Sequence, residues 1–382
     1  MIISVTGTWM QNAAQAWLVY DLTRSPLYLG IVGAIGSAPV LLFALPAGVI
    51  ADRYSKHKII FVTQTAAMIQ ASILALLVYL KVVQVWHVML LAACLGMVNA
   101  FDMPARQAMV MELVTRDDVF NAISLTSSAF NSGRIIGPSV AGLLIAAAGM
   151  AGCFFINALS FLPLIVFLAM IHPRPPQRTL EMPMLGNIFG GMRWVATNRV
   201  ATVLLIMTAV ASLFGMPYAT LMPLLAKAIF HTGPRGYGLL LSAPAAGSLM
   251  TAVLMALIGH RCRLGVIAVL GSVLFPMALL LLAGAPTYAA AIGVLFFVGV
   301  GMMSFTAVSN TILQKSAPDE MRGRVMGLRV FVHAGMAPLG NLQIGALAQW
   351  LGPRLAVTAG AVICLLTALV SWWRAPELRA SE

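Results

Sequence analysis

Charged side chains are scarce in this sequence. Asp, Glu, Lys and Arg make up 9% of the 382 residues, whereas 60% are hydrophobic, and the mean hydropathy is +0.94. A water-soluble protein of this length needs more charge to cover its surface. The composition therefore excludes a soluble globular protein and predicts a chain that crosses a membrane many times.

Several chemical motifs are also missing. The four cysteines, Cys94, Cys153, Cys262 and Cys364, lie far apart, which excludes a disulfide framework and a zinc site. No GxxxxGK[ST] or GxGxxG element is present, so this chain alone is not expected to use ATP. The predicted loops hold no paired carboxylates, no nucleophile with a base and no metal-ligand cluster. We therefore expect neither catalysis nor a cofactor nor a metal.

Apolar stretches of about 20 residues are what the sequence does contain, and each is long enough to cross a ~30 Å hydrocarbon layer as a helix. We predict an all-α membrane protein with twelve transmembrane helices. The predicted spans are residues 2–20, 28–51, 59–80, 87–105, 121–147, 152–171, 200–225, 237–258, 264–283, 287–308, 326–349 and 354–373.

Basic residues are distributed unevenly between the two sides of these spans. The net charge of +12 could suggest a nucleic-acid partner, but the basic residues are spread over short loops, so none is expected. With the N-terminus inside, the outer loops hold five of the 23 Lys and Arg, and Arg134 lies within a span. The other 17 are on the inner side: Arg53, Lys56, Lys58, Arg106, Arg116, Arg174, Arg178, Arg193, Arg199, Arg261, Arg263, Lys315, Arg322, Arg324, Arg329, Arg374 and Arg379. This bias predicts that both termini lie in the cytoplasm.

One long polar connection divides the chain. Residues 172–199 begin with a proline-rich segment and continue as a predicted amphipathic helix with Phe189 and Trp194 on its apolar side. We therefore predict a first six-helix bundle at residues 1–171, a cytoplasmic linker at 172–199 and a second bundle at 200–382. Pro138 and Pro338 lie in corresponding spans of the two bundles, as expected for repeated halves.

The connection between the second and third predicted spans is unusually rich in charge. Gly48 precedes it near the end of the second span, and the connection contains the pair Asp52-Arg53 and the basic residues Lys56 and Lys58. This pattern resembles the loop signature of the major facilitator superfamily. Longer strings, Phe101-Asp-Met-Pro-Ala-Arg-Gln-Ala, Asn157-Ala-Leu-Ser-Phe and Pro318-Asp-Glu-Met-Arg-Gly-Arg-Val among them, resemble the enterobactin-exporter branch, the transmembrane secretion effector family.

The resemblance implies two pseudo-symmetric six-helix bundles and an inner gate. It assigns the gate to Gly48, Asp52, Arg53, Lys56, Lys58, Asp102 and Arg106. Asp52 would face the start of span eleven, where a helix N-terminus carries partial positive charge, and Asp102 would pair with Arg53 or Lys56. The corresponding loop of the second half, Gly259-His-Arg-Cys-Arg, has no acid. The alternative is that these charges are only solvated orientation signals.

Span five carries small residues at regular spacing. Gly133, Gly137, Pro138 and Gly142 resemble the span-five motif of export-type carriers. Small residues allow close helix approach, and Pro138 permits a bend. The motif could also be only a packing seam, and the two interpretations are compatible.

Arg134 is the most unusual single residue, because it lies about 20 Å into span five at 1.5 Å per residue. An intramembrane Arg normally faces a cavity or a partner. We predict that it meets an anionic or strongly polar part of a substrate; the alternative is bonding to amide side chains and carbonyls. Other predicted cavity residues are Gln11, Asn12, Gln15 and Asn131, with Phe214, Tyr218, Phe297 and Met303 in the second half.

The resemblance further implies a proton-driven exporter of siderophores, drugs or similar metabolites. Asp21 and His333 are the candidate proton carriers. The expected partners are a small-molecule substrate, protons and the lipid bilayer of a bacterial inner membrane, and the expected state is a monomer. The alternatives are uptake by symport, lipid flipping, and a transport-inactive scaffold or sensor. Compared with the family, the short first span is expected to lack an opening turn.

Overall fold

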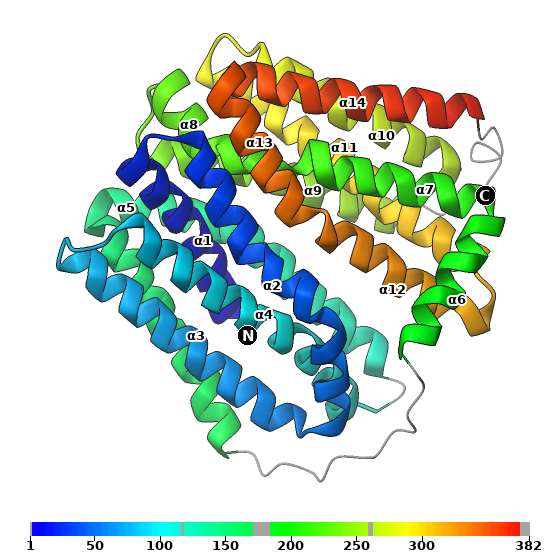
Figure 1. Ribbon diagram of the computed structural model, residues 1–382, viewed down its shortest axis with the longest axis horizontal. Helices are drawn as coiled ribbons and strands as arrows, with labels where there is room; N and C mark the ends of the chain where they lie inside the picture. Colours follow the sequence, from blue (N-terminus) through cyan, green and yellow to red (C-terminus); the bar gives the residue numbers. More distant parts are fainter. Residues whose placement is uncertain (1, 116–117, 171–183, 259–262, 375–382) are drawn as a thin grey trace. The chain divides into compact units, whose positions relative to one another are not determined.

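The computed structural model describes residues 2–115, 118–170, 184–258 and 263–374. Within these ranges the regular structure is entirely helical (Figure 1). The first helices are α1 (Ile2–Thr23), α2 (Pro26–Arg53), α3 (Lys56–Tyr79), α4 (Val85–Leu113) and α5 (Val119–Met170). After α6 (Met184–Thr197) come α7 (Arg199–Val210), η2 (Ala211–Gly215), η3 (Met216–Leu221), α8 (Met222–Leu224), η4 (Leu225–Ile229) and α9 (Pro234–Ile258). The last helices are α10 (Leu264–Ala283), α11 (Tyr288–Ser316), α12 (Asp319–Gly335), α13 (Ala337–Leu351) and α14 (Pro353–Arg374).

Two compact units account for the chain. The first consists of Met1–Glu181 together with His231–Ser242, and the second of Met182–Phe230 together with Ala243–Glu382. The start of α9 therefore groups with the first unit and the rest of that helix with the second. The predicted bundles divide the chain near the same linker but leave residues 231–242 in the second half.

Helix α5 contains two of the predicted spans. Its backbone leaves the helical region at Gly149, where φ is 72° and ψ is 177°. This left-handed conformation favours glycine because a residue without Cβ adopts it without steric cost. The chain turns there, so the predicted spans 121–147 and 152–171 are two helical segments joined at one glycine.

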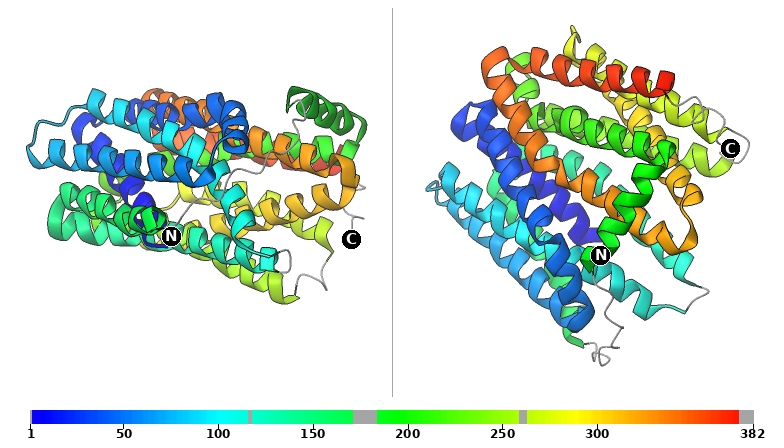
Figure 2. Two further views of the ribbon diagram at one scale, coloured as in Figure 1. Left: turned by 90° about the horizontal axis from the view of Figure 1, so that it is seen from below. Right: turned by 45° about the vertical axis from the view of Figure 1, so that its right-hand side comes forward.

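Close contacts between small residues hold the first unit together. The backbone carbonyl of Gly36 on α2 lies where a Cβ of Gly96 on α4 would be. A Cβ added at Gly133 on α5 would come within 2.8 Å of Val5 Cγ1 on α1. Helices α3 and α4 run side by side in the same unit (Figures 1 and 2). These contacts let apolar helices approach closely, as membrane helices commonly do.

The second unit has an apolar core drawn from six helices. Buried residues of α6, α7, α10, α11, α12 and α14 form one cluster, which includes Leu204, Phe305, Ile312 and Val325. Trp194 of α6 packs against this cluster, so the predicted amphipathic helix is present at the linker and covers the unit with its apolar side. The side chain of Phe189 lies outside the described residues.

The seventh predicted span is irregular. Between Arg199 and Ile229 the backbone changes from α-helix to π-helix at η2, to 3₁₀-helix at η3 and to π-helix again at η4. Pro217 and Pro223 lie within this stretch, and each removes a backbone donor. Such π-helical turns are frequent at functional sites.

Nine helical stretches among the described residues are long and apolar enough to cross a membrane. One of them, residues 128–170, covers two predicted spans. The remaining predicted spans correspond to α1 and to α12 with α13, which meet at Met336 just before Pro338. Large apolar side chains such as Leu42, Val62 and Leu257 are more than 60% exposed, as expected for helices that face lipid.

Candidate functional site: polar side chains inside two apolar helical units

The charged connection after α2 is shorter than predicted. Helix α2 continues to Arg53 and α3 begins at Lys56, which leaves only Tyr54 and Ser55 between them. The two helices therefore extend two and three residues beyond the predicted span ends at residues 51 and 59. The helices continue beyond the apolar stretch because the charged residues at their ends can still form helical hydrogen bonds.

Asp102 lies at the centre of a polar cluster on α3 and α4. Its Oδ1 accepts hydrogen bonds from Thr63 Oγ1 (2.8 Å) and Gln64 Nε2 (2.9 Å). Its Oδ2 accepts from Nε (3.0 Å) and Nη2 (2.8 Å) of Arg106, one turn further along α4. The Asp102 side chain is only 10% exposed. The cluster places an ion pair with four hydrogen bonds inside the first unit, where each bond to a charged group is strengthened by low solvent access.

The other predicted gate residues surround the junction of α2 and α3. Lys56 is buried, Arg53 and Lys58 are exposed, and Gly48 is half-buried. Both Arg53 and Lys56 make polar or electrostatic interactions. The side chain of Asp52 lies outside the described residues, as does the second-half loop at residues 259–262. Arg106 is thus the basic partner described for Asp102, and the gating role stays a prediction.

Gln11 belongs to a buried amide network. Its Nε2 donates to Gln70 Oε1 (2.9 Å), and its Oε1 accepts from Asn157 Nδ2 (2.6 Å). Ser160 Oγ donates to Asn157 Oδ1 (3.1 Å), and Gln70 Nε2 donates to the carbonyl of Leu91 (3.2 Å). Gln11 has 0% exposed surface. It connects α1, α3 and α5 in this conformation, and its predicted place in a substrate cavity stays a prediction.

The remaining polar candidates of the first unit differ in exposure. Asn12 is exposed, whereas Gln15, Asn131 and Arg134 are half-buried, and Asn131 and Arg134 both have interaction partners. Asp21 forms a 3.3 Å ion pair with Arg24 at the end of α1, and both side chains are more than a third exposed.

The span-five glycines pack against two neighbours. A Cβ added at Gly137 would lie 2.6 Å from Trp9 Cβ and 2.9 Å from the carbonyl of Thr6 on α1. One added at Gly142 would lie 2.6 Å from the carbonyl of Pro234 and 3.1 Å from Gly238 Cα at the start of α9.

The residues around this seam are also hydrogen-bonded. The hydroxyl oxygens of Ser139 and Ser242 are 2.7 Å apart and share a hydrogen bond. Ser242 Oγ also donates to the carbonyl of Ile135 (3.0 Å). Tyr237 donates from its hydroxyl to the carbonyl of Ala13 (3.1 Å). Pro138 is buried in this seam. The small residues of span five predict close helix approach, and these contacts show it.

Polar side chains also form hydrogen bonds between helices of the second unit. His333 Nδ1 lies 3.0 Å from Ser212 Oγ, which projects from the π-helical turn η2. Thr220 Oγ1 donates to Asn341 Oδ1 (2.8 Å). The irregular stretch of the seventh span therefore presents two hydroxyl groups to α12 and α13.

The guanidinium of Arg329 lies one turn before His333 on α12. Its Nη1 donates to Asn310 Oδ1 (3.2 Å) and its Nη2 to the carbonyl of Thr306 (3.0 Å), both on α11. The residue is 9% exposed. Its predicted place among the inner-side loop charges is therefore wrong. A signal was available, because position 329 falls inside the predicted span 326–349.

The predicted apolar cavity residues of the second half differ in exposure. Tyr218 is buried, Phe214 and Met303 are half-buried, and Phe297 is 53% exposed, with its ring edge-to-face against Phe296. Their shared role in binding a substrate stays a prediction.

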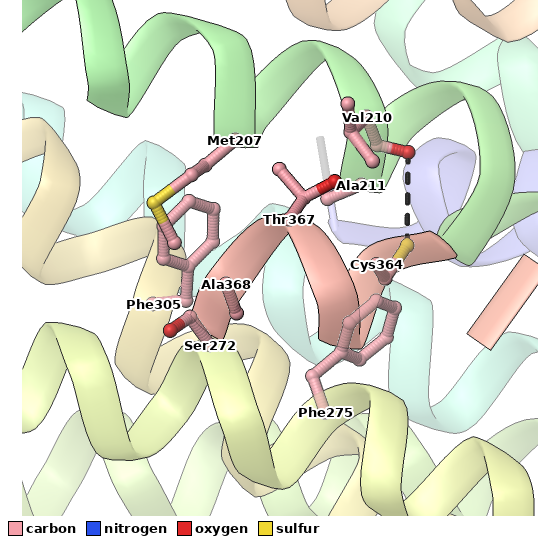
Figure 3. A pocket seen from close by; sticks show the side chains of 9 residues that line it. All are labelled: Met207, Val210, Ala211, Ser272, Phe275, Phe305, Cys364, Thr367 and Ala368. Carbon is pink, nitrogen blue, oxygen red and sulfur yellow. Dashed lines mark hydrogen bonds between the residues drawn. The ribbon is translucent and has the colours of Figure 1, made fainter. Parts of the chain in front are cut away.

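A small cavity lies beside the π-helical turn η2 (Figure 3). Its volume is about 20 Å³, which is room for one water molecule and not for an organic substrate. Cys364 faces it and directs its thiol to the carbonyl of Val210 at 3.7 Å. Among the residues with described positions, no group of three His, Cys, Asp or Glu gathers as metal ligands would.

Sequence comparison assigns the chain to a family. The transmembrane secretion effector family matches over residues 1–382. The chain belongs to this family. It is a multi-pass membrane transporter and not an enzyme.

Three relatives of this chain are similar over nearly their whole length. The staphyloferrin A transporter of Staphylococcus aureus is 27% identical over 91% of this chain and 87% of its own. The multidrug efflux pump Tap of Mycolicibacterium fortuitum is 26% identical over 98% of this chain and 93% of its own. The enterobactin exporter EntS of Shigella flexneri is 24% identical over 99% of this chain and 90% of its own.

Solved structures with the same fold include a bacterial homologue of the human lysosomal transporter Spinster. It has a TM-score of 0.77 at 13% identity and covers 99% of this chain and 97% of its own. The likeness at this identity concerns the fold, and it confirms the predicted all-α major facilitator fold.

Proposed function

We propose that this transporter exports a small organic molecule, a siderophore, a drug or a related metabolite, by alternating access in exchange for protons. The observation that carries the proposal is the similarity, over nearly the whole chain, to proteins named for siderophore and drug transport or efflux. The Asp102 cluster supports it, because the hydrogen bonds that Thr63 and Gln64 on α3 donate to Asp102 on α4 join two helices, and a change of conformation can break and reform such bonds.

Orientation and coupling belong to the same proposal. The excess of basic residues on one side supports an inner-membrane protein with both termini in the cytoplasm. Of the two candidate proton carriers, Asp21 lies in an exposed ion pair, whereas His333 is half-buried and hydrogen-bonded inside the second unit. We therefore assign proton coupling to His333, and we take the monomer as the working unit.

Metabolite comparison tests the export proposal first. Cells that lack the protein should retain one compound that cells with the wild-type protein release. Everted vesicles should then accumulate this compound only when a proton gradient is imposed, and His333→Gln should remove the dependence on the gradient. A compound enriched inside cells only when the protein is present would instead indicate uptake.

The scaffold alternative predicts something different. If the protein has no transport activity, neither its removal nor the variant Asp102→Asn should change the distribution of any solute. Accumulation of the released compound in everted vesicles by the wild-type protein, and its loss in Asp102→Asn, would contradict a scaffold role. Equal accumulation with and without a gradient would overturn the antiport mechanism.

A further inference from the structure

Arg329 is a buried cation with uncharged partners. Its two described hydrogen bonds go to the amide oxygen of Asn310 and to the carbonyl of Thr306. Within the described ranges, no Asp or Glu lies within ion-pairing distance of its guanidinium. Arg329 is also ten residues beyond the start of α12, about 15 Å along the helix at 1.5 Å per residue. Its position falls three residues inside the predicted span 326–349.

Other arginines of the chain are paired differently. Arg106 binds Asp102 through Nε and Nη2, and Arg322, two turns before Arg329 on the same helix, binds Asp319 at 2.6 Å. Arg329 has the same planar fork, but its Nε is buried without a hydrogen-bond partner among the described residues. A buried unpaired donor on a charged group is costly, and an intramembrane cation without a counter-charge is more so.

The side chains around the guanidinium of Arg329 are suited to binding a carboxylate. Asn310 accepts from Arg329 through Oδ1, which leaves its Nδ2 as a donor. His333 follows one helical turn after Arg329 and is held through Nδ1 by Ser212, which leaves its Nε2 for another partner. Asn310 and His333 are half-buried, so both residues keep part of their surface accessible. A carboxylate can accept one hydrogen bond from Nε of Arg329 and another from the second hydrogen of its Nη2. Asp102 accepts from the same two nitrogens of Arg106.

We propose that Arg329, Asn310 and His333 form a binding site for a carboxylate group of the transported molecule. The inference rests on the proposed transport function and narrows its substrate class to organic anions. Its three residues all belong to the second unit, whereas Arg134 belongs to the first.

The decisive variant is Asn310→Asp. It replaces the amide that already contacts Arg329 by an isosteric carboxylate, so it supplies a permanent counter-charge without changing the packing. We expect Asn310→Asp to unfold at an equal or higher temperature than the wild-type protein and to bind anions at least about tenfold more weakly, about 1.4 kcal/mol. Arg329→Gln should lose binding as well, and Arg322→Gln, an exposed arginine on the same helix, should keep it.

The measurement uses the purified full-length protein and benzoate, with benzamide as the uncharged match. Benzoate should raise the thermal unfolding temperature and give a titration isotherm, whereas benzamide should do neither. Equal responses of the wild-type protein to both compounds would overturn the inference, and so would Asn310→Asp binding benzoate within about twofold of wild type. Arg329-dependent benzoate binding in a protein that moves no solute would leave the site in place and overturn only the transport proposal.

Discussion

Asp102 illustrates, at the scale of single residues, how a carboxylate is kept inside an apolar helical unit. All of its described hydrogen bonds come from three side chains on α3 and α4, and both of its oxygens are used. A buried charge that is fully paired in this way is tolerated, but removal of one partner leaves the other charge uncompensated.

Asp102→Asn should therefore destabilise the protein. The change weakens the two hydrogen bonds from Arg106, each to a charged group, and we expect a loss of about 1.5–3 kcal/mol in the free energy of unfolding. Thermal unfolding of the solubilised protein measures the change. Asp118→Asn is the matched control, because Asp118 is exposed and its described side-chain hydrogen bond is to the exposed Thr115. Equal stability of the two variants would contradict the pairing.

Gln11→Leu tests the amide network in the same unit. Leucine has a similar volume, but it leaves the Gln70 oxygen and the Asn157 amide without their partner. We expect a loss of about 1–3 kcal/mol in the free energy of unfolding, the cost of an unsatisfied buried polar group. Asn12→Leu, one residue along and exposed, should have little effect. If Gln11→Leu is as stable as Asn12→Leu, the network does not stabilise the unit.

Single residues were predictable from the sequence only in part. Asp102 and Arg106 stand out because charges are rare in the spans and these two are one helical turn apart. Gln11 was predicted from its depth along the first span, but depth along a helix does not tell whether a side chain faces a cavity or a neighbouring helix. Arg329 is counted with the basic residues of the inner side, although position 329 falls inside the predicted span 326–349.

At the scale of helices, apolar length predicted the spans well and their ends less well. Helices α2 and α3 extend into the charged connection because charge does not prevent helix formation, and the boundary of hydrocarbon is not the boundary of the helix. The π-helical turns of the seventh span could not be predicted, because periodicity carries no signal for one inserted residue. Pro217 and Pro223 indicated only that the helix is interrupted there.

Gly137→Ala tests the contact between α1 and α5. The added Cβ would meet Trp9 Cβ and the carbonyl of Thr6, and backbone atoms cannot move aside as a flexible side chain can. We expect a loss of about 1–3 kcal/mol in stability from overpacking. Gly293→Ala on α11 is the control, because nothing lies within 4 Å of its added Cβ, and a helical alanine is favoured over glycine by about 0.5–1 kcal/mol. Destabilisation by both variants alike would argue against a specific α1–α5 seam.

At the scale of the whole molecule, the distribution of basic residues predicts which ends of the helices face the cytoplasm. A cysteine placed at Lys81, exposed after α3, should react with a membrane-impermeant maleimide in intact cells. A cysteine placed at Arg322, exposed on α12, should react only after the cells are permeabilised. Both substitutions are made in a variant without native cysteines. The reverse pattern of labelling would invert the proposed topology.

The grouping of residues 231–242 with the first unit has a consequence for attempts to split the gene. A fragment that stops in the linker after α5 would lack Tyr237 and Ser242, and the surfaces of α1 and α5 that they cover would be left bare. Such a fragment should not fold stably when it is expressed alone. It should fold stably only when the complementary fragment, which carries the start of α9, is synthesised in the same cell.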